Sequence, residues 1–193
     1  MTGVPVIDTG PMTVEEFYAF TDTRPDEEKW ELIDGEPILN ASPSPPHQYI
    51  VANLIFTLTL RAREIAAPWA VIPGIGARVS DISRPEPDVM IVPRLGAGLD
   101  PTRRDTTKAM VLFEVMSPSI SSRDLKWKRA AYTSMLALTH YVVIAQDAVS
   151  VAVFDRVSGF EERRLTALTD SIEFAGLGAI LPLSEIYRDT GLV

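Results

Sequence analysis

Two carboxylates beside apolar stretches, with a lysine further along the chain, form the pattern in this sequence that is best suited to chemistry. Asp88 directly precedes the apolar run 89–92, and Glu114 is the one charged residue in the run 110–116. Hard cations such as Mg²⁺ prefer oxygen ligands and usually bind through one or two carboxylates together with substrate phosphate oxygens. A lysine such as Lys128 stabilises negative charge or orients an attacking water. The pattern therefore predicts a site for a divalent metal and a phosphodiester.

Glu114 is the stronger signal, because a carboxylate inside an apolar strand is costly unless it is paired, hydrogen-bonded or bound to a metal. A buried salt bridge to an arginine or lysine is the purely structural alternative. Asp88 alone is weaker evidence, since Pro-Asp is also an ordinary turn before a strand. The alternative role for Lys128 is an exposed ion pair with Asp124, four residues earlier on a helical face that also carries Tyr132.

Composition favours one folded domain. The chain has 193 residues, of which 46% are hydrophobic, which is typical of a globular unit rather than of a disordered chain. We expect a single domain over residues 1–193, with 1–11 as a flexible N-terminal segment. No apolar run approaches the roughly 20 residues that cross a bilayer, and the N-terminus lacks the pattern of a signal peptide. We therefore expect a cytoplasmic protein with no membrane partner.

The chain has no cysteine and only two histidines, His47 and His140. This composition excludes disulfides, a thiolate zinc site and a thiol nucleophile, and it disfavours a metal site made of several histidines. Oxygen ligands are therefore the ones that a metal site in this chain would use.

A formal net charge of −8 works against general attraction to nucleic acid, whose non-specific affinity comes mostly from Lys and Arg contacts to phosphate. Binding would then depend on a local basic patch, although charge runs of this kind are usually solvated surface. The candidates are Arg61 with Arg63, Arg103 and Arg104 with Lys108, and the segment 123–129.

The first third of the chain predicts helices around a hairpin. A capping box at 13–16 begins a short helix, and a turn at 34–35 joins the two arms of a hairpin over 30–39. The proline-rich segment 41–46 predicts a loop. Apolar residues at helical spacing then predict a long amphipathic helix over 50–65.

The remainder is predicted to be mostly strand. Strands over 70–79 and 89–92 are separated by a proline-rich bend, and the apolar run 110–116 suits a buried central strand. Helical spacing resumes from 122 to about 138. The later elements are expected to be strands at 141–145, 149–154 and 160–165 and a short helix at 183–187.

Five motifs occur in an order typical of one protein family. They are ELIDGE at 31–36, SPSPPH ending at His47, PDV at 87–89, EVMSPS at 114–119, and the spaced residues Asp124, Lys128 and Tyr132. In this order, from about Met12 to Tyr187, the chain resembles the Uma family of putative restriction endonucleases. That family belongs to the PD-(D/E)XK, restriction-endonuclease-like superfamily. Each motif is weak by itself, and the five together are fairly specific.

The resemblance implies an α/β fold with a restriction-endonuclease-like mixed central β-sheet flanked by α-helices and an additional β-rich C-terminal part. It also implies a Mg²⁺-dependent hydrolytic site, with Mn²⁺ as an alternative metal. By motif, Asp88 and Glu114 correspond to the metal-binding carboxylates, and the Val115 carbonyl to a further ligand. Glu31 corresponds to an additional acidic residue, and Lys128 takes the lysine role, so that Glu31, Asp88, Glu114 and Lys128 are the expected catalytic residues.

One residue departs from the superfamily's simple pattern, because the position two after Glu114 is Met116 rather than lysine. The resemblance therefore requires a lysine on the following helix, where Lys126 is a rival to Lys128. Asp124 and Tyr132 are secondary candidates. His47 matches a family histidine, and a helix-start or packing role is favoured for it over a phosphate contact or a proton carrier.

The predicted function is metal-dependent endonucleolytic hydrolysis of phosphodiester bonds in nucleic acid, with DNA as the expected substrate and a homodimer as the expected assembly. The alternative is a nucleic-acid-binding or regulatory module on the same fold with little or no hydrolytic activity. The acidic charge balance and the displaced lysine favour this alternative. A third interpretation is a non-catalytic homodimer or scaffold that pairs through its β-rich C-terminal half.

Overall fold

The computed structural model describes residues 10–116 and 122–192. Most of the expected flexible segment 1–11 lies outside these residues, as does the end of the motif at 114–119. The single domain expected over 1–193 remains a prediction. In the described part of the chain, no helix is both long and apolar enough to span a membrane.

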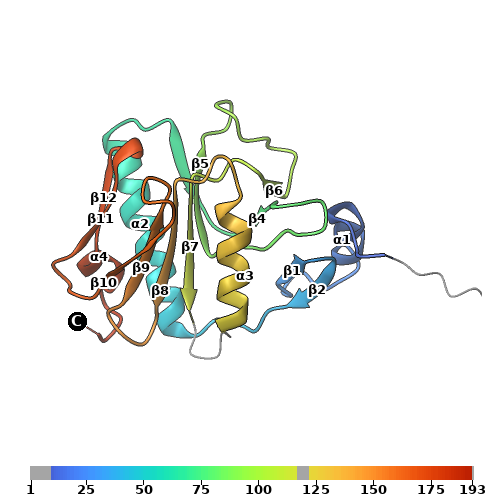
Figure 1. Ribbon diagram of the computed structural model, residues 1–193, viewed down its shortest axis with the longest axis horizontal. Coiled ribbons are helices and arrows are strands. Elements are labelled where there is room, and N and C mark those ends of the chain that lie inside the picture. Colours follow the sequence, from blue (N-terminus) through green and yellow to red (C-terminus); the bar gives the residue numbers. More distant parts are fainter. Residues whose placement is uncertain (1–9, 117–121, 193) are drawn as a thin grey trace, which may run out of the picture.

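A six-stranded mixed sheet forms the centre of the fold, in the order β10-β9-β8-β7-β5-β3 (Figure 1). Neighbouring strands β7 and β8 are parallel, whereas the other pairs are antiparallel. Parallel neighbours need a long crossover, and α3 (Ser122–Thr133) supplies it. The strands are β3 (Trp69–Ile72), β5 (Val89–Pro93), β7 (Val111–Met116), β8 (His140–Ala145), β9 (Val151–Asp155) and β10 (Glu162–Leu165). The expected mixed central sheet is confirmed.

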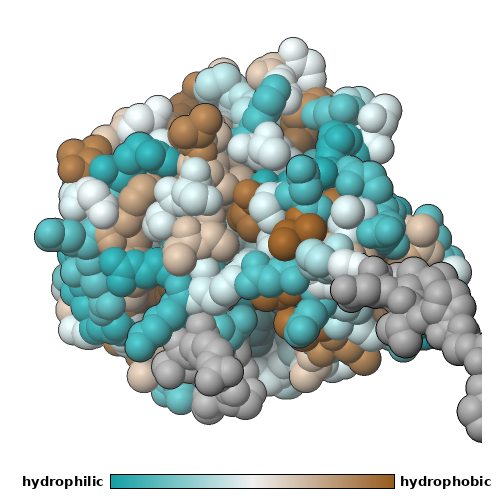
Figure 2. Space-filling model, turned by 45° about the vertical axis from the view of Figure 1, so that its right-hand side comes forward, coloured by the Kyte–Doolittle hydropathy of each residue, from teal (hydrophilic) through white to brown (hydrophobic). Residues whose placement is uncertain are grey.

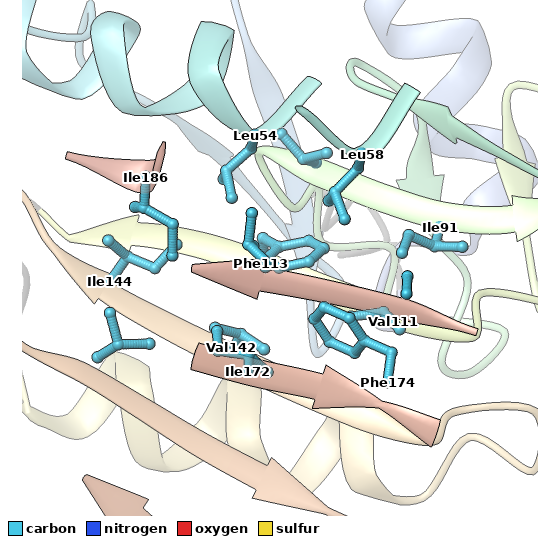
Figure 3. Packing of buried hydrophobic residues seen from close by; sticks show 14 of the residues in the cluster. Leu54, Leu58, Ile91, Val111, Phe113, Val142, Ile144, Ile172, Phe174 and Ile186 are labelled. Carbon is cyan, nitrogen blue, oxygen red and sulfur yellow. The ribbon is translucent and has the colours of Figure 1, made fainter. Parts of the chain in front are cut away.

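Helices cover both faces of this sheet. The long helix α2 (Pro45–Glu64) packs on one face, where Leu54 and Leu58 lie over Phe113 of β7 (Figure 3). On the other face, Tyr132 of α3 packs in one cluster with Leu112 of β7. Side chains alternate between the faces of a strand, so the residue at 114 joins Leu112 on the α3 face. This parity directs Glu114 toward α3.

The β-rich C-terminal part completes the α2 side of the core. A separate antiparallel hairpin of β11 (Ser171–Phe174) and β12 (Ala179–Pro182) is joined by the short 3₁₀ helix Ala175–Leu177 and followed by α4 (Leu183–Ile186). Its buried Ile172 and Phe174 belong to the same apolar cluster as Phe113 (Figure 3). The sequence patterns predicted α4 but did not identify this hairpin.

The N-terminal part has the predicted capping box and hairpin. Thr13 caps α1 (Val14–Thr21), and its hydroxyl and the Glu16 carboxylate satisfy each other's backbone N–H groups. Strands β1 (Trp30–Ile33) and β2 (Glu36–Leu39) pair antiparallel. Their turn has positive φ angles of 49° at Asp34 and 84° at Gly35, as a two-residue hairpin turn requires.

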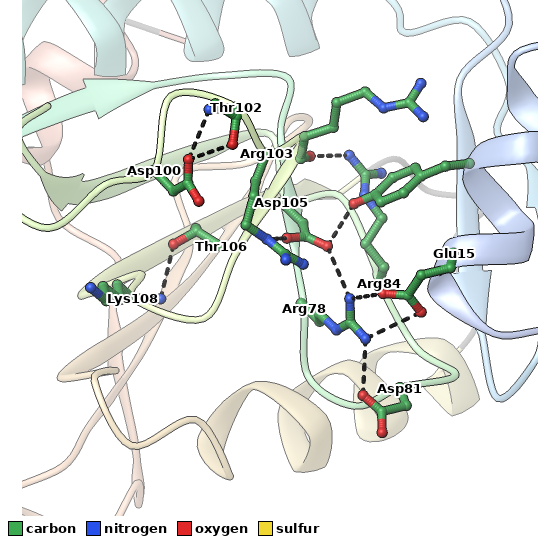
Figure 4. A network of polar contacts seen from close by, with 12 residues as sticks. Glu15, Arg78, Asp81, Arg84, Asp100, Thr102, Arg103, Asp105, Thr106 and Lys108 are labelled. Atoms are coloured by element: carbon green, nitrogen blue, oxygen red, sulfur yellow. Dashed lines mark hydrogen bonds and ion pairs between the residues drawn. The ribbon is translucent and has the colours of Figure 1, made fainter.

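An arginine-rich network ties α1 to a small parallel sheet of β4 (Gly76–Ala77) and β6 (Asp105–Thr106) (Figure 4). The buried Asp105 carboxylate accepts hydrogen bonds from Tyr18 at 2.6 Å and from Arg103 at 2.8 Å. Arg78 lies 3.9 Å from the same carboxylate and also bonds Glu15 of α1. A buried carboxylate needs such partners, so these contacts fix the N-terminal part against the rest of the domain.

Three predicted elements need correction. The strand expected over 70–79 is two strands, because the chain turns at Pro73 and Gly74, where φ is 70°, and β4 then leaves the central sheet for β6. The loop expected over 41–46 ends early, since Pro45 begins α2 behind the N-cap Ser44; a proline suits the first helical turn, whose N–H groups have no helical partner. The helix expected to reach about 138 ends at Thr133. Turns between Thr133 and His140 then bring the chain into β8.

Candidate active site

The predicted site residues converge where β7 ends. The first turns of α2 and α3 lie at the same edge of the sheet (Figure 1). Because β5 runs antiparallel to β7 with Val89 opposite Phe113, the residue before β5, Asp88, lies beside Glu114. Sheet register therefore brings together two carboxylates that are far apart in the sequence.

Asp88 is held by two neighbours. Its Oδ2 accepts a hydrogen bond of 2.7 Å from the Val115 backbone N–H. Its Oδ1 lies 3.2 Å from Nε2 of His47. The carboxylate is partly exposed, so it remains accessible from solvent while its orientation is fixed on both oxygens.

Glu114 is buried and shared by two donors from α3. Its Oε1 accepts hydrogen bonds from the Tyr132 hydroxyl at 2.7 Å and from Lys128 Nζ at 3.1 Å, and its Oε2 lies 3.3 Å from the same ammonium. Burial raises the pKa of Glu114 to about 8, against the attraction of Lys128 and with the repulsion of Asp88 and Glu31. Additional positive charge at this point would therefore favour the ionised carboxylate.

Lys128 bridges two buried carboxylates. Its Nζ donates to Glu31 Oε1 at 3.1 Å as well as to Glu114. Burial alone would lower the pKa of Lys128, but the two carboxylates outweigh burial and raise the pKa above its usual range. The side chain is therefore an ammonium at neutral pH, suited to stabilising negative charge and unsuited to accepting a proton.

Glu31 comes from the β1–β2 hairpin, which docks on the segment leading to Asp88. Leu32 and Arg84 exchange backbone hydrogen bonds of 3.3 Å and 2.7 Å. The Glu86 backbone N–H then donates to Glu31 Oε1 at 2.7 Å. The hairpin thus carries a third carboxylate to Lys128 from outside the central sheet.

His47 combines the helix-start position with a contact in the site. Its backbone N–H donates to the N-cap Ser44 hydroxyl at 3.4 Å, and its ring reaches Asp88. The ring Nδ1 is buried without a hydrogen-bond partner in the described part of the protein. The favoured helix-start role agrees with this geometry, and the ring also contacts Asp88 in the candidate site.

The two lysine candidates, Lys126 and Lys128, differ in burial and in their position relative to the site. Lys126 is exposed and does not line the pocket described below, whereas Lys128 is buried between carboxylates. Asp124 is half-buried one turn before Lys128. Burial raises its pKa and the charge of Lys128 opposes that shift. Of the secondary candidates, Tyr132 makes direct contact with Glu114.

A pocket of about 730 Å³ opens over these groups. Glu31, Asp88, Glu114 and Lys128 lie along its wall, together with His47. Residues that the motifs did not single out also line it. They are Lys29, Trp30, Asn40, Gln48, Glu86 and Gln146, among others.

Comparison with known proteins assigns the family. The family model of Uma2, described as a putative restriction endonuclease, matches residues 14–183. This chain belongs to the Uma2 family. Its fold is also similar to the crystal structure of a putative nuclease belonging to DUF820 from Anabaena variabilis, with a TM-score of 0.75 and 14% identity over 92% of this chain and 98% of that chain. A search of curated proteins gives no match.

The donor atoms of this Uma2 chain suit a hard divalent cation. Asp88 and Glu114 offer carboxylate oxygens side by side, and the repulsion among Asp88, Glu31 and Glu114 that helps to raise the pKa of Glu114 is what a cation relieves. Within residues 10–116 and 122–192, no three acidic or histidine side chains form a ready-made ligand cluster. Mg²⁺ commonly binds through one or two carboxylates and completes its shell with water and phosphate, so two carboxylates are a sufficient anchor.

The motifs of the Uma2 family did not reveal the polar groups around the anchor. Gln146 directly follows β8, the parallel neighbour of β7, and its Oε1 accepts a hydrogen bond of 2.8 Å from the Ser44 hydroxyl. Its position after a strand parallel to the one carrying Glu114 is the signal that could have placed it at this edge. Trp30 and Gln48 carried no comparable signal, because tertiary docking alone brings them to the pocket.

Proposed function

We propose that this chain is a divalent-metal-dependent endonuclease that hydrolyses phosphodiester bonds in DNA. The observation that carries the proposal is Glu114, a buried carboxylate at the end of a central strand that lines a pocket beside Asp88 and contacts Lys128. A purely structural ion pair needs neither the adjacent carboxylate nor the opening to solvent. Membership of a family described as putative restriction endonucleases supports the same reaction.

In this proposal, Asp88, Glu114 and the Val115 carbonyl would hold Mg²⁺ or Mn²⁺. Such a metal would supply Lewis-acid stabilisation of the phosphate and would make water a better nucleophile. Lys128, held as an ammonium by Glu31 and Glu114, stabilises the negative charge that develops on the oxygens of the phosphoryl group. Because its pKa is raised, Lys128 acts through charge and hydrogen bonding and does not serve as the base.

Two further side chains keep these groups in position. The Tyr132 hydroxyl fixes the Glu114 carboxylate at 2.7 Å, and the His47 ring lies 3.2 Å from Asp88. Glu31 orients Lys128 from the hairpin. We assign these three residues positioning roles, since their contacts are with the groups that would meet the substrate.

One observation favours the alternative of a binding module with little hydrolytic activity. The Lys128 ammonium already lies within 3.1 Å of both Glu31 and Glu114, so the protein partly neutralises its own acidic site. Metal binding distinguishes the two functions. An endonuclease requires that Mg²⁺ or Mn²⁺ bind in spite of this ammonium, whereas a binding module does not.

The test incubates the full chain with single- and double-stranded DNA and RNA in Mg²⁺ or Mn²⁺, with a chelator control. Glu114→Gln and Asp88→Asn should each abolish metal-dependent cleavage while circular dichroism and the unfolding transition remain cooperative. Glu173→Gln is the matched control, because Glu173 is exposed on β11. Unchanged cleavage in both site variants would refute the proposal.

The homodimer and the cytoplasmic location are further proposals that rest on the family resemblance and the sequence. Light scattering on the full chain tests the assembly. A monomer at micromolar concentration would remove the homodimer.

A further inference from the structure

We propose that the pocket takes an unpaired stretch of DNA, either a single strand or the splayed end of a duplex, in preference to uninterrupted duplex. This inference rests on the proposed function and narrows its substrate class. Three observations support it: the depth of the reacting groups, the charge of the pocket and the chemistry of its walls.

The reacting groups lie deep in the protein. Glu114 and Lys128 expose only 6% and 7% of their surfaces, and Glu31, which orients Lys128, exposes 4%, whereas Asp88 is partly exposed. A phosphodiester must therefore enter the pocket to meet Glu114 and Lys128. A volume of about 730 Å³ lies in the range of small-molecule sites, roughly 300–1,000 Å³, which accommodates a few nucleotides of one strand more readily than two paired strands.

The charge of the pocket does not suit a duplex. Among the described residues, its wall carries two lysines, Lys29 and Lys128, and the second already contacts two carboxylates. The four acidic residues among them are Glu31, Glu86, Asp88 and Glu114. Proteins that hold duplex DNA gain most of their general affinity by neutralising many phosphates, so this wall provides little of that affinity.

The basic patch expected at Arg103, Arg104 and Lys108 does not supply the missing charge. Arg103 bonds Asp105 at 2.8 Å, and Arg104 bonds Asp22 at 2.7 Å. Lys108 Nζ donates to the Gly98 carbonyl at 2.8 Å (residues of this network appear in Figure 4). These cations serve contacts within the protein. The surface in Figure 2 is mainly hydrophilic with scattered apolar groups, and the chain as a whole has a net charge of −8.

The walls instead carry groups that recognise bases. Trp30 is partly exposed. Its indole N–H donates to the Glu28 carboxylate at 2.8 Å, and its ring centroid lies 5.0 Å from that of Phe20. The exposed side-chain amides of Asn40 and Gln48 make no hydrogen bond to any other described residue. Aromatic rings stack on unpaired bases, and Asn or Gln amides bind base edges. In a duplex, stacking covers the faces of the bases and pairing occupies their Watson–Crick edges, so an unpaired strand offers these groups more to contact.

Binding is measured by fluorescence anisotropy with a labelled 12-nucleotide DNA strand, its blunt duplex and the RNA of the same sequence, all in chelator. The single DNA strand should bind at least tenfold more tightly than the duplex. Its affinity should depend weakly on salt, with a log–log slope of magnitude about 1–2, because each phosphate contact on a single strand contributes about 0.7.

Variants locate the binding to the pocket wall. Trp30→Ala should weaken single-strand binding at least about fivefold, the lower end for loss of one stacked base. Since Trp30 also packs in the hairpin, the double variant Asn40→Ala with Gln48→Ala, at two exposed positions, provides the second test and should weaken binding about tenfold. Arg163→Ala, at an exposed position of β10, is the control and should leave binding unchanged.

The outcomes separate this inference from the proposed function. Duplex bound as tightly as the single strand, RNA bound more tightly than DNA, or wall variants that behave like Arg163→Ala would each overturn the inference. Tight single-strand binding in a protein that cleaves nothing in any metal would refute the endonuclease and support the inference. Cleavage of duplex, together with duplex binding as tight as single-strand binding, would support the endonuclease and overturn the inference.

Discussion

Removal of the ammonium from the candidate active site should destabilise the protein in a pH-dependent way. In Lys128→Met, the methionine keeps most of the side-chain volume but leaves Glu31 and Glu114 buried without the cation that lies 3.1 Å from each. Loss of one partner of a buried ion pair costs about 3–5 kcal/mol when the remaining charge stays ionised. That range is the expected loss at the alkaline end of the measurements.

The pH dependence follows from the direction of the pKa shifts. Glu114 has a folded-state pKa of about 8 against an ordinary value of 4.5, so its contribution to stability is present below about 4.5 and is lost as pH rises through about 8. Without the ammonium, the pKa of Glu114 rises further. In acid, protonation of Glu114 removes its uncompensated charge from the variant. The difference in unfolding free energy between the variant and the wild type should therefore be smallest near pH 5 and largest near pH 8.5. Lys128 itself stays charged throughout, because its pKa is raised.

Urea unfolding at pH 5, 7 and 8.5 measures these differences, with Lys126→Met as the matched control at an exposed lysine of the same helix. The control should change stability by less than about 0.5 kcal/mol at every pH. Calorimetric titration should also show tighter Mg²⁺ binding to Lys128→Met, since the ammonium no longer competes for the carboxylates. A loss that is equal at all three pH values, or equal in the two lysine variants, would refute the reasoning.

Three other outcomes are expected. Tyr132→Phe removes the 2.7 Å bond to buried Glu114 and should cost about 1–3 kcal/mol in urea unfolding; a cost below 0.5 kcal/mol would contradict that contact. Thr13→Ala removes the N-cap of α1 and should cost about 0.5–2 kcal/mol in the same assay, without effect on nuclease assays. Met116→Lys in the Lys128→Met background should recover part of the lost stability at pH 8.5, because position 116 shares the face of β7 that carries Glu114. No recovery would place that side chain out of reach.

Local signals predicted the local structure. The capping box at Thr13 and the turn at Asp34 and Gly35 depend on contacts within a few residues, and both were confirmed. The errors occurred where tertiary packing decides. Within residues 70–79, Pro73 and Gly74 were a local turn signal that the single predicted strand passed over. The pairing of β4 with β6 rather than with the central sheet could not be read locally, because it depends on residues about 30 positions later in the chain.

The candidate site divides in the same way. A charge within an apolar run identified Glu114, since burial without a partner is costly. The proximity of Asp88 and Glu114 could not be read from the sequence, because it requires the antiparallel register of β5 and β7. The docking of the hairpin against Arg84, which brings Glu31 to Lys128, is likewise a property of the folded chain. The catalytic roles themselves remain predictions.

The position of Lys128 has a geometric explanation. In the simple superfamily pattern the lysine stands two residues after the glutamate, on the same face of the strand, and here that position is Met116. The helix α3 crosses the same face of the sheet, so Lys128 approaches Glu114 from above the strand rather than along it. A lysine has a long flexible stem and a compact charge, and both routes can deliver an ammonium to one carboxylate. A lysine on α3 also comes with Tyr132, which contacts Glu114, and Lys128 itself contacts Glu31 of the β1–β2 hairpin. The displaced lysine therefore connects three separate parts of the chain at the carboxylate on which the proposed chemistry depends.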